Sequence, residues 1–241
     1  MRLRFTFFFK GIKKVNMIRF ISDYFFPSKT SVGPSGPSGP SAAGPLCFDM
    51  KRMLPNKFSV CIGKRHTGKS WLIRDIILHS SAPTKIAYSS TEDVCPFYTD
   101  FLPKDRVKSN LDDLENVLDE NQQSSKNGLL IAIDSFDGVC DNKMLKRISL
   151  NQRCNNVTLV VSLQYPKSIP LFLREDTDYV FLFNDNANDL KKCWECYAGM
   201  IPTFDEFKSL FYECTKEKYS CMVIDKVNQQ VFYYKARGGC T

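Results

Sequence analysis

Short apolar runs alternate with amphipathic segments along most of the chain. The runs that favour β-strand lie at 57–62, 85–90, 128–134, 157–164 and 179–183. The segments that favour helix, some with Leu and Val at helical spacing, lie at 71–78, 110–118, 143–151, 188–197 and 204–214. Strands that alternate with helices predict a parallel sheet with helices on both faces.

Two more apolar runs follow the last predicted helix. They lie at 219–225 and 231–235, and together they predict a C-terminal β-hairpin around Val227-Asn228-Gln229-Gln230. The segment from 91 to 103 is predicted to be a loop. The expected fold is therefore α/β, with a mostly parallel central sheet flanked by helices, and its binding site is expected at the carboxyl ends of the strands.

The first 45 residues differ from the rest of the chain. Residues 1–28 interleave basic residues with Phe and Ile, and residues 29–45 contain three Gly-Pro-Ser triplets, which is typical of an extended, disordered linker. We expect a basic and aromatic N-terminal segment at 1–28, a linker at 29–45 and a folded domain at 46–241. Residues 1–28 have two interpretations: an unstructured extension with Met17 as an alternative start, or a basic amphipathic anchor on a membrane surface or capsid.

Hydrophobicity and charge limit the function classes. No apolar stretch approaches the roughly 20 residues that span a bilayer, so no transmembrane segment is expected, and the small-residue cleavage site of a secretory signal is lacking. The net charge is +7, but residues 1–45 carry seven basic residues against Asp23 alone, which leaves +1 for the rest. A DNA-binding surface on the domain must therefore be a local patch.

The ten cysteines are scattered along the chain. Cys193 and Cys196 form the only close pair, and with only two histidines in the chain this is weak evidence for a zinc site. We therefore expect reduced cysteines and an intracellular compartment.

A glycine-flanked motif lies between the first predicted strand and the first predicted helix. It reads Gly63-Lys64-Arg65-His66-Thr67-Gly68-Lys69-Ser70 and fits the G-x-x-x-x-G-K-[ST] pattern of a phosphate-binding loop. Glycines let backbone N–H groups point at a phosphate, and the helix N-terminus adds the positive end of its dipole. We expect this loop to bind ATP, with Lys69 at the β- and γ-phosphates and Ser70 as a Mg²⁺ ligand.

Asp134 ends the third predicted strand, 65 residues after Lys69. This is where an NTPase places its Walker-B acid, which holds Mg²⁺ through the ion's hydration shell. Hydrolysis also needs a group that orients or deprotonates the attacking water, and in many ATPases the next residue supplies it. Here the next residue is Ser135, which cannot accept the proton. The remaining candidates for this catalytic acid are Glu92, Asp93 and Asp137.

Three further polar residues suit chemistry at a γ-phosphate. Gln164 ends the fourth predicted strand, at 157–164, and we interpret it as a sensor that hydrogen-bonds the γ-phosphate or the attacking water; the alternative is an ordinary loop glutamine. Arg153 and Arg174 are candidate arginine fingers, which would stabilise γ-phosphate charge from a neighbouring subunit.

Together these segments resemble the genome-packaging ATPases of nucleocytoplasmic large DNA viruses, the poxvirus-type branch of the FtsK–HerA superfamily of P-loop NTPases. The resemblance spans residues 57 to about 235. It rests on the phosphate loop, Ser90-Thr91-Glu92, Phe97–Pro103, Leu130–Asp134, Arg153 ahead of Val157–Pro166, and Ile169–Arg174 leading to Asp178–Phe183. The Gln-Tyr-Pro segment with the downstream Leu-Arg and Asp-Tyr-Val-Phe is far more specific than the phosphate loop.

The resemblance implies a ring-forming motor that hydrolyses ATP with Mg²⁺ and pumps double-stranded DNA into a preformed capsid. It implies a capsid or inner-membrane component of the virion as a partner, and a location at the assembly site in the host cytoplasm or in the virion. Gln164 would be the polar sensor, and Arg153 or Arg174 the arginine that acts on a neighbouring subunit.

Two positions depart from the family's pattern. Ser135 stands where the family often has a second acid, and Cys154 where it often has histidine. The first departure implies either that Glu92 takes over as catalytic acid or that hydrolysis is slow. Two other functions stay open: a related DNA-pumping ATPase of a mobile element or conjugation system, and a nucleotide-binding assembly protein with weak hydrolysis.

Overall fold

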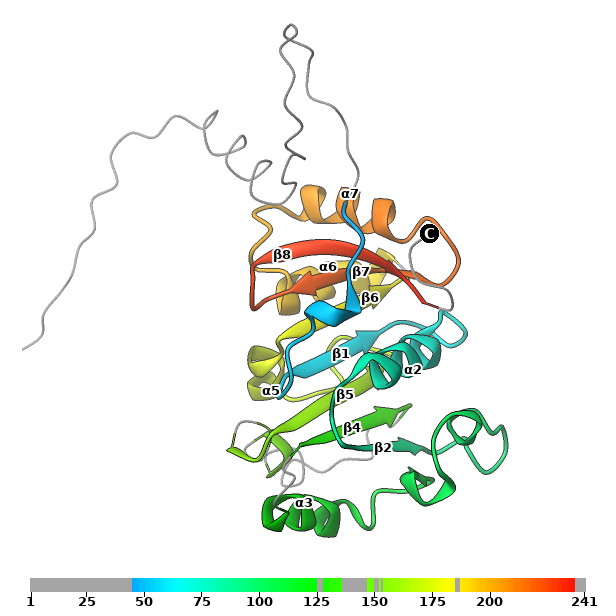
Figure 1. Ribbon diagram of the computed structural model, residues 1–241. Coiled ribbons are helices and arrows are strands. Elements are labelled where there is room, and N and C mark those ends of the chain that lie inside the picture. The colour runs from blue at the N-terminus through cyan, green and yellow to red at the C-terminus, as the bar shows by residue number, and fades with distance from the viewer. Residues whose placement is uncertain are drawn as a thin grey trace, which may run out of the picture. The chain divides into compact units, whose positions relative to one another are not determined.

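One sheet runs through the domain in the computed structural model, in the order β3-β2-β4-β5-β1-β6-β7-β8 (Figure 1). The structure describes residues 45–124, 128–135, 147–149, 152, 154–184 and 187–236. The strands are β1 Phe58–Ile62, β2 Thr84–Ser89, β3 Val107–Lys108, β4 Leu129–Asp134, β5 Val157–Leu163, β6 Tyr179–Phe183, β7 Ser220–Asp225 and β8 Gln230–Lys235. Residues 1–44 lie outside this description, so the expected N-terminal segment, linker and domain boundaries stay predictions.

The strands from β3 to β6 are all parallel, and β7 and β8 continue the sheet as an antiparallel hairpin. Every residue of β1, β4, β5 and β6 is buried. Such continuous apolar strands are typical of a parallel sheet that is covered on both faces. The predicted fold, a mostly parallel sheet with flanking helices and a C-terminal hairpin, is confirmed.

The helices bury their apolar sides against this sheet. The α-helices are α2 Lys69–His79, α3 Leu114–Gln123, α5 Leu171–Asp176, α6 Ala187–Tyr197 and α7 Phe204–Cys214, and short 3₁₀ turns occupy η1 Met50–Arg52, η2 Tyr98–Asp100 and η3 Lys104–Arg106. Helix α2 packs on β4 and β5, and α7 packs on β7 and β8. Figure 1 shows α2 in front of the sheet, α3 beside the end of the sheet that contains β2, and α7 beside the end that contains β8. In the described part of the chain, no helix has the length and apolarity to cross a bilayer.

Residues 45–53, which we call the strap, connect the start of the domain to its last strand. The Phe48 amide donates to the Tyr233 carbonyl at 2.8 Å, and the Tyr233 amide donates to the Leu46 carbonyl at 3.0 Å. The Phe48 side chain is 1% exposed. Its ring lies 5.5 Å from that of Phe232 and 6.0 Å from that of Phe181, measured between centroids. The strap thus adds an aromatic anchor to the core beside the hairpin.

Several predicted boundaries differ from the structure. The helix predicted at 110–118 begins at Leu114 instead, because the Asn110 side chain accepts a hydrogen bond from the Asp112 amide and favours a turn. The short elements η2, η3, β3 and α5 were not predicted, and one of them, η2, interrupts the loop expected at 91–103. Of the helix predicted at 143–151, residues 147–149 are helical and the others lie outside the described residues.

Among the cysteines that the structure describes, Cys47 departs from the expected reduced state, since it is disulfide-bonded. The spacing of the cysteines along the sequence shows only Cys193 and Cys196 as close neighbours, whereas a disulfide requires two cysteines that are close in space. The free cysteines in the described part of the chain are Cys61, Cys95, Cys154, Cys193, Cys196, Cys214 and Cys221.

We expect Phe48→Ala to lower the free energy of unfolding by about 3–5 kcal/mol, because it empties an aromatic site in the core. Leu46→Ala is the matched control on the same strap, since Leu46 is 40% exposed; its effect should stay within about 0.5 kcal/mol. Urea unfolding of both variants measures the difference. Equal effects would mean that the strap is not anchored through Phe48.

Candidate functional site

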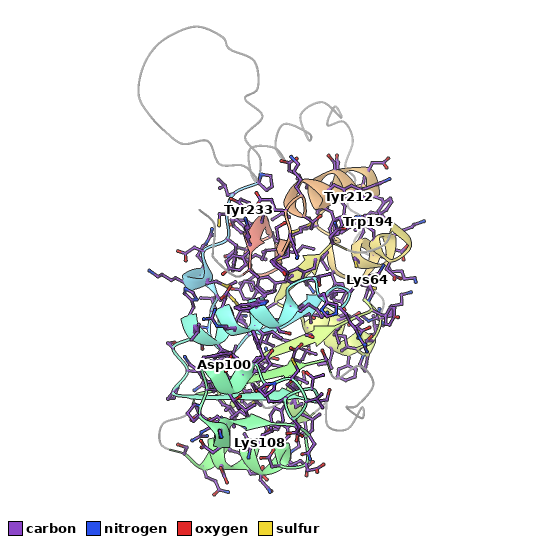
Figure 2. All side chains as sticks on the ribbon, turned by 90° about the vertical axis from the view of Figure 1, so that its right-hand side faces the viewer. Lys64, Asp100, Lys108, Trp194, Tyr212 and Tyr233 are labelled. Atoms are coloured by element: carbon purple, nitrogen blue, oxygen red, sulfur yellow. The ribbon has the colours of Figure 1, made fainter. Side chains whose placement is uncertain are left out.

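The candidate site lies where the carboxyl ends of β1, β5 and β4 meet. Strand β5 lies between the other two, so the loop after β1 and the end of β4 flank the end of β5. Figure 2 turns this edge of the sheet toward the viewer and labels Lys64 in the loop after β1. The topology therefore gathers the predicted loop, Asp134 and Gln164 at one edge.

The loop Gly63–Ser70 leads from β1 into α2 under tight packing. A Cβ atom on Gly63 would lie 2.7 Å from Cβ of Phe183, which is too close for two carbon atoms. Gly68 has a φ of 113°, and a Cβ atom there would lie 3.1 Å from the Tyr219 ring. Glycine is therefore required at both positions.

Lys69 begins α2 and turns back onto the loop. Its ammonium donates to the carbonyls of Gly63 and Lys64, both at 2.7 Å, and the residue is only 7% exposed. The Thr67 hydroxyl donates to the same Lys64 carbonyl at 2.8 Å. The loop thus encloses a buried cation, and an anionic ligand would be a stronger partner for it than a neutral carbonyl.

The carboxylate of Asp134 is the centre of the hydrogen bonding at this edge. Its Oδ2 accepts from the Ser70 hydroxyl at 2.6 Å and from the Tyr98 hydroxyl at 2.8 Å. Its Oδ1 accepts from the Ser162 hydroxyl at 2.6 Å and, more weakly, from Ser135 at 3.4 Å. The residue is 4% exposed, and these donors offset the cost of burying its charge.

Ser70 and Asp134 present oxygen atoms of the kind that suit a hard cation. Mg²⁺ is usually held by one or two carboxylates together with phosphate oxygens and water. The described residues contain no cluster of three or more His, Cys, Asp or Glu that would form an all-protein cage. A hydroxyl and one carboxylate beside a phosphate-binding loop therefore fit Mg²⁺ that arrives with a nucleotide.

The candidate acids lie in different surroundings. Glu92 follows β2 and is 7% exposed, and its carboxylate accepts hydrogen bonds from residues 97–99. Asp93 is exposed on the same loop, and Ser135 is exposed with a φ of 62°. Asp137 lies outside the described residues. The only described candidate that faces solvent is thus Asp93.

The sensor and arginine candidates lie in different parts of the chain. Gln164 follows β5 directly and is half-buried at the same edge of the sheet as Asp134. Arg174 lies in α5, where its guanidinium donates to the Ile169 carbonyl and to Cys196 Sγ, both at 3.2 Å. Arg153 lies outside the described residues. In this conformation Arg174 is bound within its own subunit.

Sequence reasoning assigned no role to four residues that shape this edge. They are Tyr98 and Ser162, which donate to Asp134, and Phe183 and Tyr219, which pack against the glycines of the loop. Tyr219 has a φ of 69°, an uncommon conformation for a bulky residue. Ser162 could have been noticed as a hydroxyl near the end of an apolar strand, but no sequence signal separates the two aromatic packing residues from ordinary core.

Known proteins provide a comparison with this arrangement. No family model matches the chain. L437 of Acanthamoeba polyphaga mimivirus is 31% identical over 217 residues, which cover 79% of this chain and 76% of L437. Protein 075L of Invertebrate iridescent virus 6 is 31% identical over 196 residues, 73% of this chain and 76% of that protein. Both relatives are uncharacterized.

Solved structures show the same fold. The genome packaging NTPase B204 from Sulfolobus turreted icosahedral virus 2, in complex with ATP-gammaS, matches with a TM-score of 0.57 and 17% identity, covering 76% of this chain and 99% of B204. B204, the DNA-packaging ATPase from Sulfolobus turreted icosahedral virus, matches with a TM-score of 0.53 and 16% identity over the same shares. The relatives and the fold confirm the resemblance indicated by the sequence motifs.

We expect Gly68→Ala to lower the free energy of unfolding by about 1–3 kcal/mol, because alanine rarely adopts the required φ and its Cβ would press on Tyr219. Gly199→Ala is the matched control, since a Cβ atom there meets nothing within 4 Å. Thermal and urea unfolding of the two variants give the comparison. A Gly68→Ala protein as stable as the control would show that the loop relaxes without strain.

Proposed function

Because the chain belongs to the family of large-DNA-virus proteins that includes L437 and 075L, and has the B204 fold, we propose that it is a genome-packaging ATPase. In this proposal it hydrolyses ATP with Mg²⁺ and uses the energy to move double-stranded viral DNA into a capsid. The observation that carries the proposal is the 2.6 Å hydrogen bond between Ser70, at the end of the glycine-flanked loop, and Asp134. This pair joins a phosphate-binding element to an acid that can hold a metal.

Lys69 has the charge and position to bind the transferred phosphoryl group. Its two carbonyl partners are neutral, so the ammonium gains a charge-assisted bond by moving to the β- and γ-phosphate oxygens. There it would offset the negative charge that spreads over the γ-phosphate oxygens in the transition state. Water attacks the γ-phosphorus, the bond to the β-phosphate oxygen breaks, and ADP leaves with that electron pair.

Ser70 and Asp134 would hold Mg²⁺, which supplies positive charge along the β- and γ-phosphates. The Ser70 hydroxyl provides one oxygen ligand and still has its proton for Asp134. Asp134, held by donors on both oxygens, keeps one orientation toward that ion. The two residues thereby fix where the nucleotide's phosphates lie relative to Lys69.

The proton of the attacking water needs an acceptor. Ser135 is unsuitable, and the Glu92 carboxylate is already occupied by four donors. We therefore favour Asp93 or Asp137 as the acid that takes this proton, with Gln164 orienting the water from the end of β5. An arginine from a neighbouring subunit, Arg153 or Arg174, would complete the site; Arg174 would first have to leave Ile169 and Cys196.

The motor function follows from placing this site between subunits. A ring in which one subunit's arginine closes another's nucleotide site couples each hydrolysis to a movement at the interface. The proposed partners are double-stranded DNA, further copies of this chain and a capsid or inner-membrane component of the virion. The proposed location is the assembly site in the host cytoplasm or the virion itself.

We expect Lys69→Ala to lower the rate of Mg²⁺-dependent ATP hydrolysis at least about 100-fold, since it removes the charge that faces the transferred phosphoryl group. Lys85→Ala is the matched control, because that ammonium also donates to a backbone carbonyl, of Ile77, but at the start of β2, away from the site. The release of inorganic phosphate over time measures the hydrolysis rate of each variant. Nucleotide binding without turnover in the unsubstituted protein would favour the assembly-protein function.

We expect double-stranded DNA to stimulate hydrolysis. We also expect that mixing Lys69→Ala subunits into the wild-type protein lowers the rate by more than the fraction of inactive subunits. Both effects follow if adjacent subunits complete one another's sites around DNA. Steady-state rates measured over a series of mixing ratios test this. Rates that ignore DNA and fall linearly with the inactive fraction would contradict the motor, while leaving the ATPase intact.

A further inference from the structure

The loop after β2 is organised by the buried carboxylate of Glu92. Its Oε1 accepts from the Phe97 amide at 3.0 Å and from both the amide and the hydroxyl of Thr99, each at 3.0 Å. Its Oε2 accepts from the Tyr98 amide at 3.2 Å. One side chain thus holds three consecutive residues of the backbone in a single turn.

These hydrogen bonds also set the charge of Glu92. Burial by itself raises the pKa of a carboxyl group, but the bonds from Thr99, Phe97 and Tyr98 outweigh it, and the pKa of Glu92 lies below its ordinary value. The carboxylate therefore stays ionised at neutral pH and accepts from four donors, three at Oε1 and one at Oε2. Both properties suit an anchor for the turn better than an acceptor of the water's proton.

The turn that Glu92 holds directs Tyr98 at the site. Tyr98 is 1% exposed, and its ring centroid lies 5.1 Å from that of Phe97 and 5.7 Å from that of Phe101. Phe97 in turn meets Trp71 of α2 at 5.2 Å. This aromatic cluster fastens the loop to the helix that carries Ser70, and it leaves the Tyr98 hydroxyl 2.8 Å from Asp134 Oδ2.

The Tyr98 hydroxyl is one of several donors that hold the Asp134 carboxylate. Ser70 and Tyr98 donate to the same Oδ2, from α2 and from the loop after β2, and Ser162 donates to Oδ1 from β5. Donors from three elements leave the carboxylate little freedom to turn.

We infer that Glu92 and Tyr98 are positioning residues: Glu92 fixes the turn, and the Tyr98 hydroxyl fixes the orientation of Asp134 toward the metal. The inference rests on the proposed function, because it concerns the Mg²⁺ that would arrive with the nucleotide. Neither residue touches the reacting atoms. Replacing a hydrogen-bond partner of a metal-binding side chain typically lowers metal affinity or activity by about 10- to 100-fold.

The test compares Tyr98→Phe with Tyr88→Phe in the full chain. Each change removes one hydroxyl and keeps the ring, and each hydroxyl donates to a carboxylate: Tyr98 to Asp134 at 2.8 Å, and Tyr88 to Asp113, which has no part in the proposed metal site, at 3.1 Å. Binding of Mn²⁺ in the presence of a non-hydrolysable ATP analogue, followed by the paramagnetic signal of free Mn²⁺, measures metal affinity. Tyr98→Phe should weaken it about 10-fold or more, while Tyr88→Phe should leave it unchanged.

Hydrolysis and metal-free nucleotide binding give independent readouts. Tyr98→Phe should lower kcat at saturating ATP and leave the affinity for ATP without metal unchanged. Unchanged metal affinity and kcat in Tyr98→Phe would overturn the inference, as would equal losses in Tyr88→Phe, which would indicate general destabilisation. If the unsubstituted protein neither binds Mn²⁺ with the analogue nor hydrolyses ATP, the proposed function itself fails and the inference falls with it.

The link between the two residues has its own test. If Glu92 acts through Tyr98, then Glu92→Gln should weaken Mn²⁺ binding too, and the double variant should lose little more than the worse single variant. Additive losses would show that the two residues act separately. A Glu92→Gln protein that keeps full Mn²⁺ affinity but no hydrolysis would make Glu92 the catalytic acid instead and overturn its positioning role.

Discussion

The hydrogen bond from Ser70 to Asp134 is the contact on which the rest of the candidate site depends. Ser70 lies in the first turn of α2, which follows β1, whereas Asp134 ends β4, and β5 separates β1 from β4 in the sheet. Adjacent strands lie about 4.8 Å apart, so the two elements must be joined across the end of β5. Ser162, near that end, is small enough to leave room and donates to the same carboxylate at 2.6 Å.

The packing around this contact explains the constraints on the loop. Phe183 and Tyr219 press on Gly63 and Gly68 from the side of β6 and β7, and the aromatic cluster of the β2 loop presses on α2 through Trp71. The start of α2 is therefore held between two aromatic groups. Its position relative to Asp134 is set by packing as well as by hydrogen bonds, which is how a site can be prepared before its ligand arrives.

Most of the parallel sheet was predictable from the sequence, because buried strands read as continuous apolar runs. Asp134 was found because an acid ends such a run. Glu92 was placed correctly after β2, but its role could not be read, because its partners are backbone amides whose directions depend on the turn. The contact between Tyr98 and Asp134 was not predicted, because the two residues are 36 positions apart and Tyr98 lies in an aromatic stretch that looks like ordinary core. The two-residue β3 and six-residue α5 are too short to show a period.

The covering of β8 by the strap has a consequence for how copies of this chain can assemble. An open strand edge is a template for β-augmentation, in which a second chain extends the sheet. In the described part of the chain, the backbone of Tyr233 is already paired with Leu46 and Phe48, and the opposite edge strand, β3, has two residues. In the proposed ring, neighbouring subunits would therefore meet through side chains, and such contacts could break and re-form at every turnover.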